Sequence, residues 1–395
     1  DLIKILKTGH HGVALTDKEW KTLYNWIDFN APYHSKFKAN IFKGVEQISR
    51  RTELTNKYAS SGVDWQEAIR SYADYLSKQE KPAAVKPERK EYKDKEVKLK
   101  GWPFDAATAK AMLSKETETQ KSIELAPGIR MNFVRVPAGS FVMGNNKGHS
   151  DYSPVNKQEV KKAFWMGEIE VSNEQFRTIF PEHNSRFIGQ LWKDHVHEGY
   201  PANNPEQPAI RVSWQEAMDF CKKLSEKTGL NVTLPTEVQW EWACRAGSDD
   251  DFWYGSLNTD FAKFENLADV QLNKAAVRGV NPQPMNPNDS WYKYYTYQPK
   301  ENGVDDGNML MVKGGSYQAN PWGLYDMQGN VAEWTRSDYM PYPYNEKAQD
   351  GTGTEKVARG GSWTEHPKTC TSYYRKAYLP WQKVYNVGFR VIIED

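Results

Sequence analysis

The pattern of apolar and polar positions changes near residue 123. Before it, helical spacing is clear in only two places. Thr16 and Glu19 have the spacing of a capping box, and the helix that they begin is expected to end near residues 30–32, where a proline disfavours helix in the residue before it. A second helix is predicted over 65–76. After residue 123, short apolar runs alternate with Gly, Pro, Asn and Asp, which is typical of short strands and long loops.

Two helices can be placed within the loop-rich part. Ser213 is expected to cap a helix over 214–226, and Thr236 a second helix that begins after Pro235. Apolar residues recur on one face of each. In the first helix these are Ala217, Phe220, Cys221 and Leu224, and in the second they are Val238, Trp242 and Ala243.

Several strands are expected beside these helices. Residues 131–137 and 140–144 alternate as strands do, and a tight Pro-Ala-Gly turn joins them. A last strand is expected over 387–392. The residues from 123 to 395 therefore predict one α+β domain with much irregular structure.

A charged segment separates this domain from the first helices. Residues 78–100, KQEKPAAVKPERKEYKDKEVKLK, are almost all Lys, Glu, Pro and Asp. Such a segment buries too little apolar area to offset the entropy of ordering it, so it is read as a linker, with a surface helix after Pro87 as the alternative. The predicted organisation is a helical segment over 1–77, a linker over 78–122 and the domain over 123–395.

Composition excludes several functions. The 52 basic and 51 acidic residues balance, so nucleic acid is not expected as a partner. No apolar run is long enough for a transmembrane helix, and without a leader the chain is expected to be a mature or trimmed form. The three cysteines form no C-x-x-C pair, which argues against structural zinc or haem attachment.

Seven short motifs follow one another between residues 136 and 390. They are VPAGSFVMG at 136–144, EVSNEQF at 170–176, PAIRVSWQEA at 208–217, LPTEVQWEW at 234–242, GLYDMQGNVAEW at 323–334, RGGSW at 359–363 and NVGFR at 386–390. In this order they resemble the formylglycine-generating enzymes and their sulfatase-modifying-factor relatives. The resemblance implies a single compact domain of the sulfatase-modifying-factor fold, which is related to the C-type lectin fold, with the first hundred residues outside it.

The resemblance also implies two calcium sites. Calcium prefers several oxygen ligands from flexible loops. The first site matches the side chains of Asp326 and Glu333 with the carbonyls of Gly329 and Val331. The second matches the Asn266 side chain, the Leu267 carbonyl, Asp306 and the Asn308 carbonyl. The alternative is that these oxygens cap loops without a metal.

The founding enzymes oxidise a sulfatase cysteine to formylglycine, using two cysteines five residues apart that hold Cu(I). The second cysteine matches Cys370, but the first matches Glu365, and a carboxylate is a poor ligand for this soft ion. A copper site is therefore expected to be absent or very weak. The candidate catalytic residues at this position are Cys370, Glu365, Ser362 and His366.

Other chemistry at these residues stays open. A mixed set of Glu365, His366 and Cys370 could hold Zn²⁺ or Fe²⁺, and a Cys–His nucleophile pair is a second option. Adjacent side chains of an extended chain point in opposite directions, which argues against the mixed set. We therefore favour a polar loop over a buried, inert thiol. Cys221 and Cys244 are likewise expected to be free buried thiols, since the cysteines that pair with them in some relatives have no match here.

Four further residues belong to motifs that line or support a groove in the relatives. These candidate substrate-binding residues are Trp334, Trp363, Arg375 and Arg390, with core packing and loop bracing as the alternative for Trp334 and Arg390. The function expected is that of a non-catalytic, calcium-braced domain, periplasmic or extracellular, that binds a peptide, glycan or protein partner. The alternative is a formylglycine-generating-type oxidase, or a related oxidation at the same pocket.

Overall fold

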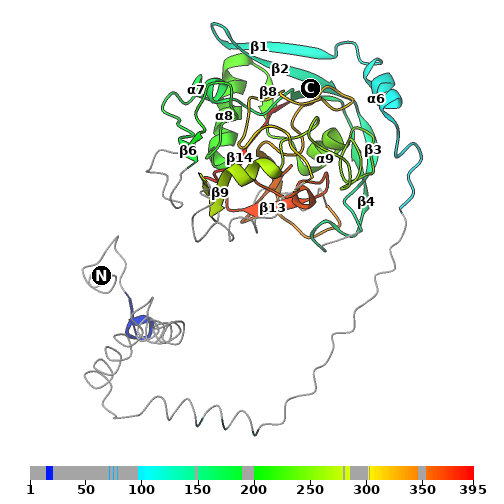
Figure 1. The fold of residues 1–395 in the computed structure, drawn as a ribbon. Helices are drawn as coiled ribbons and strands as arrows, with labels where there is room; N and C mark the ends of the chain where they lie inside the picture. The colour runs from blue at the N-terminus through cyan, green and yellow to red at the C-terminus, as the bar shows by residue number, and fades with distance from the viewer. Residues whose placement is uncertain are drawn as a thin grey trace. The chain divides into compact units, whose positions relative to one another are not determined.

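The chain forms two compact units, residues 1–91 and residues 92–395. In the first unit, Thr16 and Glu19 form the predicted capping box: the Glu19 N–H donates to Thr16 Oγ1 over 3.4 Å, and the Thr16 N–H donates to Glu19 Oε2 over 2.8 Å. The rest of that helix, most of the helix predicted over 65–76 and nearly all of the segment over 78–96 lie outside the described residues. This computed structural model describes residues 15–20, 71, 74, 78, 97–146, 150–188, 200–278, 281–284, 301, 303–345 and 353–395 (Figure 1).

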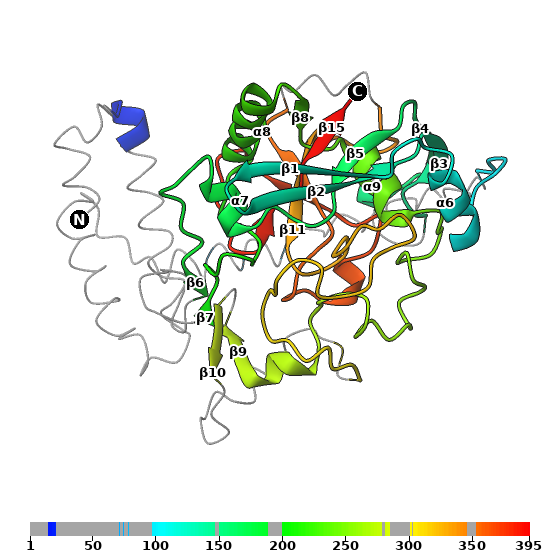
Figure 2. The ribbon, with the colours of Figure 1, turned by 90° about the horizontal axis from the view of Figure 1, so that it is seen from above.

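An antiparallel five-stranded sheet crosses the second unit, with the strand order β1-β2-β5-β15-β8. Figure 2 shows α7 and α8 on one side of this unit and α6, β3 and β4 on the other, and Figure 1 agrees. The strands are β1 (Gln120–Ala126), β2 (Ile129–Val136), β5 (Phe164–Gly167), β15 (Ile392–Glu394) and β8 (Asn231–Thr233).

A four-stranded sheet, in the order β13-β12-β11-β14, carries the candidate site. Its β11 and β14 run parallel, and the other pairs are antiparallel. These strands are β11 (Ala332–Asp338), β12 (Lys356–Arg359), β13 (Arg375–Tyr378) and β14 (Val387–Gly388). The remaining strands form two-stranded pairs: β3 (Gly139–Met143) with β4 (Asn156–Val160), β6 (Phe187–Ile188) with β7 (Tyr200–Pro201), and β9 (Ala275–Arg278) with β10 (Asn281–Pro284).

Side-chain caps begin the helices. Ser172, Ser213 and Thr236 each form a full capping box, which satisfies two backbone N–H groups at each helix start. The helices predicted to follow Ser213 and Thr236 begin at the predicted residues, and their predicted inward faces are buried. The helices are α6 (Ala106–Leu113), α7 (Asn173–Arg177), α8 (Trp214–Thr228) and α9 (Glu237–Arg245), with 3-10 turns η2 (Ser150–Tyr152), η3 (Val270–Lys274) and η5 (Pro367–Thr369).

Two strand predictions were wrong in their pairing. β2 and β3 do not form a hairpin, because β1 and β5 occupy both edges of β2 and β3 pairs with β4. The expected last strand over 387–392 is divided into β14 and β15, which belong to different sheets. A Cβ at Gly139 would lie 2.6 Å from the Trp242 ring, so the start of β3 packs closely on α9.

Aromatic side chains fill the interior of the second unit. Trp242 and Trp322 contact each other at 5.0 Å between ring centroids, and Phe104 contacts both. Residues that the sequence analysis placed in the linker thus pack against the core together with α6. The described residues include no helix long and apolar enough to cross a membrane.

Candidate functional site

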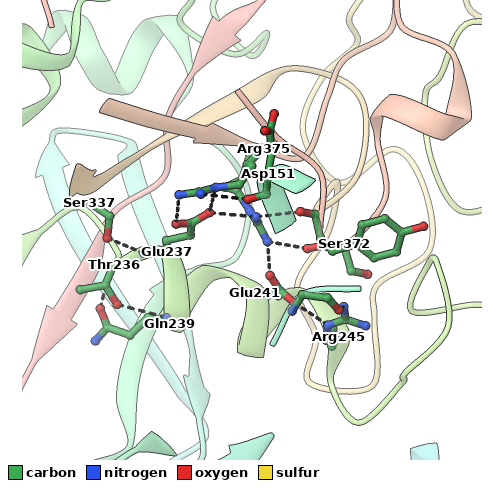
Figure 3. A network of polar contacts seen from close by, with 12 residues as sticks. Asp151, Thr236, Glu237, Gln239, Glu241, Arg245, Ser337, Ser372 and Arg375 are labelled. Atoms are coloured by element: carbon green, nitrogen blue, oxygen red, sulfur yellow. Dashed lines mark hydrogen bonds and ion pairs between the residues drawn. The ribbon is translucent and has the colours of Figure 1, made fainter. Parts of the chain in front are cut away.

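The RGGSW motif is anchored to α9 by buried charges. Arg359 lies at the end of β12 and donates to Glu237 Oε1 over 3.0 Å, and it also pairs with Glu241. Arg375 on β13 donates to Glu237 Oε2 over 2.7 Å, and Arg245 donates to Glu241 Oε1 over 2.9 Å. Figure 3 shows Glu237, Glu241, Arg245 and Arg375 converging in this network. The pairs position the loop that follows β12.

That loop folds closely over a thiol. Gly361 has φ +76°, and a Cβ there would lie 2.3 Å from Cys370 Sγ, so only glycine fits without a shift of its neighbours. Cys370 is fully buried, and its Sγ lies 3.7 Å from the Glu365 carbonyl oxygen. Burial raises the pKa of this thiol to about 12. The thiol is therefore protonated at neutral pH and is a poor nucleophile and metal ligand.

Glu365 is engaged by residues from two other segments. Its Oε1 accepts from Lys376 Nζ on β13 and, over 3.3 Å, from Asn386 Nδ2. The same Asn386 nitrogen donates to Ser362 Oγ over 2.8 Å. Oε2 of Glu365 is buried and has no hydrogen-bond partner among the described residues. Burial lowers the pKa of Lys376 to about 7.

The His366 side chain caps a short 3-10 turn. Its Nδ1 accepts from the Lys368 N–H over 3.2 Å, which caps η5. Burial lowers the pKa of the imidazole. Glu365, His366 and Cys370 thus have separate partners, although they are close in sequence.

The four candidate substrate-binding side chains are all buried. Trp334 is fully buried and donates through Nε1 to the Val212 carbonyl over 2.9 Å. Arg390 is fully buried and donates to Glu333 and to the carbonyls of Gly167 and Tyr325. Trp363 and Arg375 are 1% and 4% exposed, too little for a surface contact. The structure places all four in packing and bracing roles, and their contact with a ligand stays a prediction.

Some of the oxygen atoms at the first predicted calcium site could bind a cation, and others already have partners. Asp326 is buried with φ +53°, and its Oδ2 accepts from the Gly315 N–H over 2.6 Å. Its Oδ1 has no hydrogen-bond partner among the described residues. Glu333 is already engaged: Arg390 donates to both of its oxygens, and Trp240 Nε1 donates to Oε2 over 2.8 Å. One of the two predicted carboxylates is therefore open to a cation.

The second predicted site lies against the first. The Asn330 N–H donates to the Asn266 carbonyl over 2.8 Å, and a Cβ at Gly329 would lie 2.5 Å from that oxygen. Asn266 Oδ1 is buried without a partner in the described part of the chain. Asp306 accepts from the Asn308 N–H over 2.7 Å, and burial raises the pKa of this carboxyl to about 7.

Two acids that the sequence analysis missed join this region. Glu170 and Glu265 are fully buried, and each has one oxygen without a partner among the described residues. Burial and then the charge of Asp326 raise the pKa of both well above the usual value. Unpaired oxygens beside excess negative charge favour a hard cation. In the described ranges no three His, Cys, Asp or Glu side chains form a ready metal group, so a cation would also need carbonyl ligands.

The comparisons with known proteins first define the class of fold. The structure of PvdO from Pseudomonas aeruginosa superposes with a TM-score of 0.53 over 71% of this chain and 100% of that chain, at 23% sequence identity. At this identity the similarity concerns the fold alone. The predicted class, a loop-rich α+β sulfatase-modifying-factor fold, is confirmed.

The family follows from the sequence match. Residues 119–395 match the Sulfatase-modifying factor enzyme 1-like domain (FGE-sulfatase), so the chain belongs to this family. The formylglycine-generating enzyme of Mus musculus is 24% identical over 307 residues, covering 65% of this chain and 73% of that protein. The inactive C-alpha-formylglycine-generating enzyme 2 of Bos taurus is 26% identical over 284 residues, covering 62% and 80%. The family thus includes proteins named as enzymes and one named as inactive.

Copper(I) does not fit the residues at the loop after β12. A two-coordinate Cu(I) site needs soft thiolate ligands. Here one candidate ligand is the protonated thiol of Cys370, and the other is the hard carboxylate of Glu365, which is paired with Lys376.

Proposed function

We propose that this chain is a non-catalytic member of its family, which binds a peptide, glycan or protein partner outside the cytoplasm. One observation carries the proposal: Glu365, at the position that matches the first copper ligand of the founding enzymes, is paired with Lys376. The buried, protonated thiol of Cys370 supports it. No step of oxidation can be assigned to a carboxylate that is held in an ion pair beside an inert thiol.

Calcium is part of the same proposal. Asp326 Oδ1 and Asn266 Oδ1 are buried oxygens without partners among the described residues. Both belong to the loops that Gly329 brings into contact. Calcium there would neutralise the buried carboxylates and brace the loops on which a partner binds. A weak calcium site fills most readily where calcium is abundant, which supports a periplasmic or extracellular location.

An exposed tryptophan supports partner binding. Trp381 is 68% exposed, the most exposed large hydrophobic side chain among the described residues. It lies in a turn in which the Gln382 N–H donates to the Leu379 carbonyl over 3.0 Å, and the Leu379 N–H donates to Gln382 Oε1 over 2.7 Å. A rigid turn that presents an indole loses little entropy on binding, and indoles are frequent anchors for peptides and sugars.

Turnover with a sulfatase peptide tests the absence of catalysis. The protein is incubated with Cu(I), oxygen, a thiol reductant and a cysteine-containing sulfatase peptide, and mass spectrometry looks for the aldehyde product. We expect none, while the mouse formylglycine-generating enzyme serves as the positive control. Metal analysis of the purified protein should find calcium without copper, iron or zinc. Aldehyde formed by the wild type and lost in Cys370→Ser would establish the oxidase alternative instead.

Binding is tested on peptide and glycan arrays with two matched variants. Trp381→Ala removes the exposed indole, and Met340→Ala removes the other exposed large hydrophobic side chain, which is 36% exposed. We expect the signal of the wild type to be lost in Trp381→Ala and kept in Met340→Ala. The reverse pattern would place the partner on a different surface.

A further inference from the structure

Three polar side chains from three separate segments meet beside the loop after β12. Glu365 Oε1 accepts from Lys376 Nζ and, over 3.3 Å, from Asn386 Nδ2. Two nitrogen atoms that donate to one oxygen lie no more than about 6 Å apart, which is two hydrogen-bond lengths. Asn386 is 2% exposed, and the side chains of Lys376 and Glu365 are 16% and 18% exposed. An amine, a primary amide and a carboxyl group are therefore held within reach of one another, largely away from bulk water.

Main-chain contacts hold each of the three in place. Lys376 lies within β13, and the pairing of β13 with β12 fixes its backbone. The Asn386 carbonyl accepts from the Ala332 N–H over 3.0 Å, and the Glu365 N–H donates to the Ser362 carbonyl over 2.9 Å. Ser362 Oγ also accepts from Asn386 Nδ2 over 2.8 Å, which orients the amide. Groups that a fold holds together in this way react as if they were at a high effective concentration.

The chemical state of these groups suits the formation of an amide. An amine attacks a carbonyl carbon only in its uncharged form. Burial lowers the pKa of Lys376 to about 7, so a substantial fraction of this side chain is the free amine at neutral pH. The negative charge of a carboxylate makes its carbon a poor target, whereas the primary amide of Asn386 is uncharged. Glu365 Oε1 contacts both nitrogen atoms, as a group that moves a proton between them must.

We propose that Lys376 and Asn386 form an intramolecular amide cross-link, with Glu365 as the proton-transfer group. Glu365 first takes a proton from the lysine ammonium, and Nζ then attacks Cγ of Asn386 and forms the new C–N bond. Glu365 gives its proton to Nδ2, the bond between Cγ and Nδ2 breaks, and ammonia leaves. The attacking nitrogen returns one proton to Glu365. An amine and a primary amide thus become a secondary amide and ammonia, and no oxidant or cofactor is consumed.

The cross-link joins β13 to the segment before β14. It closes a loop between residues 376 and 386, and such a link stabilises a fold mainly by restricting the unfolded chain. All three cysteines are free, so the amide supplies a covalent link that the thiols do not, and reductants cannot cleave it. The inference goes beyond the proposed function and leaves it unchanged, because Glu365 is a carboxyl group before and after the reaction.

Intact-mass spectrometry of the full chain under denaturing conditions tests for the bond. We expect the wild type to be lighter than its sequence mass by one ammonia. Lys376→Arg, Asn386→Ala and Glu365→Gln should each have the full sequence mass, because they lack the amine, the amide and the proton-transfer group. Lys383→Arg is the matched control: Lys383 is 56% exposed and pairs with Glu216, so this variant should lose the ammonia as the wild type does.

Tryptic peptides locate the bond. Trypsin does not cleave after an acylated lysine, so residues 376–383 should be recovered joined to residues 384–390. A wild type with the full sequence mass would overturn the inference. So would loss of ammonia with the two peptides separate, which indicates cyclisation of an asparagine, or loss of water with Lys376 joined to Glu365. Turnover of a sulfatase peptide would refute the proposed function without changing any of these masses.

Discussion

If calcium binds at Asp326 as proposed, its removal should make the stability of the domain fall as the pH rises from about 4 to about 6. Without a metal, burial raises the pKa of Asp326 from 3.8 to about 6. The folded state then holds a proton that the unfolded state has already released between about pH 4 and pH 6. Because the folded state binds more protons in that window, the free energy of unfolding falls as the pH rises through it.

The magnitude follows from the size of the shift. A shift of about two pKa units corresponds to about 3 kcal/mol, which the metal-free protein loses between pH 4 and pH 6 and does not recover at pH 7. Calcium would satisfy Asp326 Oδ1 and favour the ionised carboxylate, so it should restore this energy at pH 7. The free energy of binding adds to the stability in proportion to the logarithm of the calcium concentration.

Denaturant unfolding of metal-stripped protein at pH 4.5 and pH 7, with and without added calcium, measures both effects. Asp326→Asn is the matched variant: asparagine tolerates the positive φ of this position and carries no charge. It should be more stable than metal-free wild type at pH 7 by up to about 3 kcal/mol, and calcium should not stabilise it further. Stability of the wild type that is independent of both pH and calcium would refute the reasoning.

Three further predictions concern the scaffold. Arg359→Gln removes one of the two arginines that pair with each of Glu237 and Glu241, which keep Arg375 and Arg245. Urea unfolding should therefore show a loss of about 3 kcal/mol, the lower end of the range for breaking a buried ion pair, and a loss below about 1 kcal/mol would contradict the role of the network. Burial lowers the pKa of His183 to about 4. The free energy of unfolding should therefore fall by about 2 kcal/mol, after allowance for solvent screening, as the pH drops from about 6.5 to about 4. In His183→Gln this part of the pH profile should disappear. Gly361→Ala should lower the melting temperature far more than Gly128→Ala. Both glycines have similar positive φ values, but only a Cβ at position 361 would lie against another residue, Cys370. Equal losses would show that backbone strain alone determines the effect.

Local sequence signals predicted the helices well. Ser213 and Thr236 supply caps that act within four residues, so the starts of α8 and α9 can be read without any tertiary information. The strands were harder, because the pairing of β2 is decided by β5 and not by its neighbour in sequence. Short strands of this kind carry little local information about which sheet they join.

The sequence identified single residues of the candidate site but not the residues that contact them. The departure at Glu365 is visible in the sequence, whereas its contacts with Lys376 and Asn386 come from β13 and from the segment before β14. The burial of individual side chains could not be read from the motifs either. Trp334 and Arg390 belong to motifs that suggested a groove, yet both are fully buried. Motif spacing identifies the loop, and only the packing of distant segments shows which atoms remain open.

The division of the final motif between two sheets has a consequence for biosynthesis. β15 lies between β5 and β8, and β14 is added to β11, so residues 387–394 complete both sheets. During translation these residues leave the ribosome after nearly all the others of the domain. The five-stranded sheet therefore cannot close before residues 392–394 are available, and β5 and β8 each lack one neighbour until then. Until β15 is added, the facing edges of β5 and β8 are open to pairing with other chains.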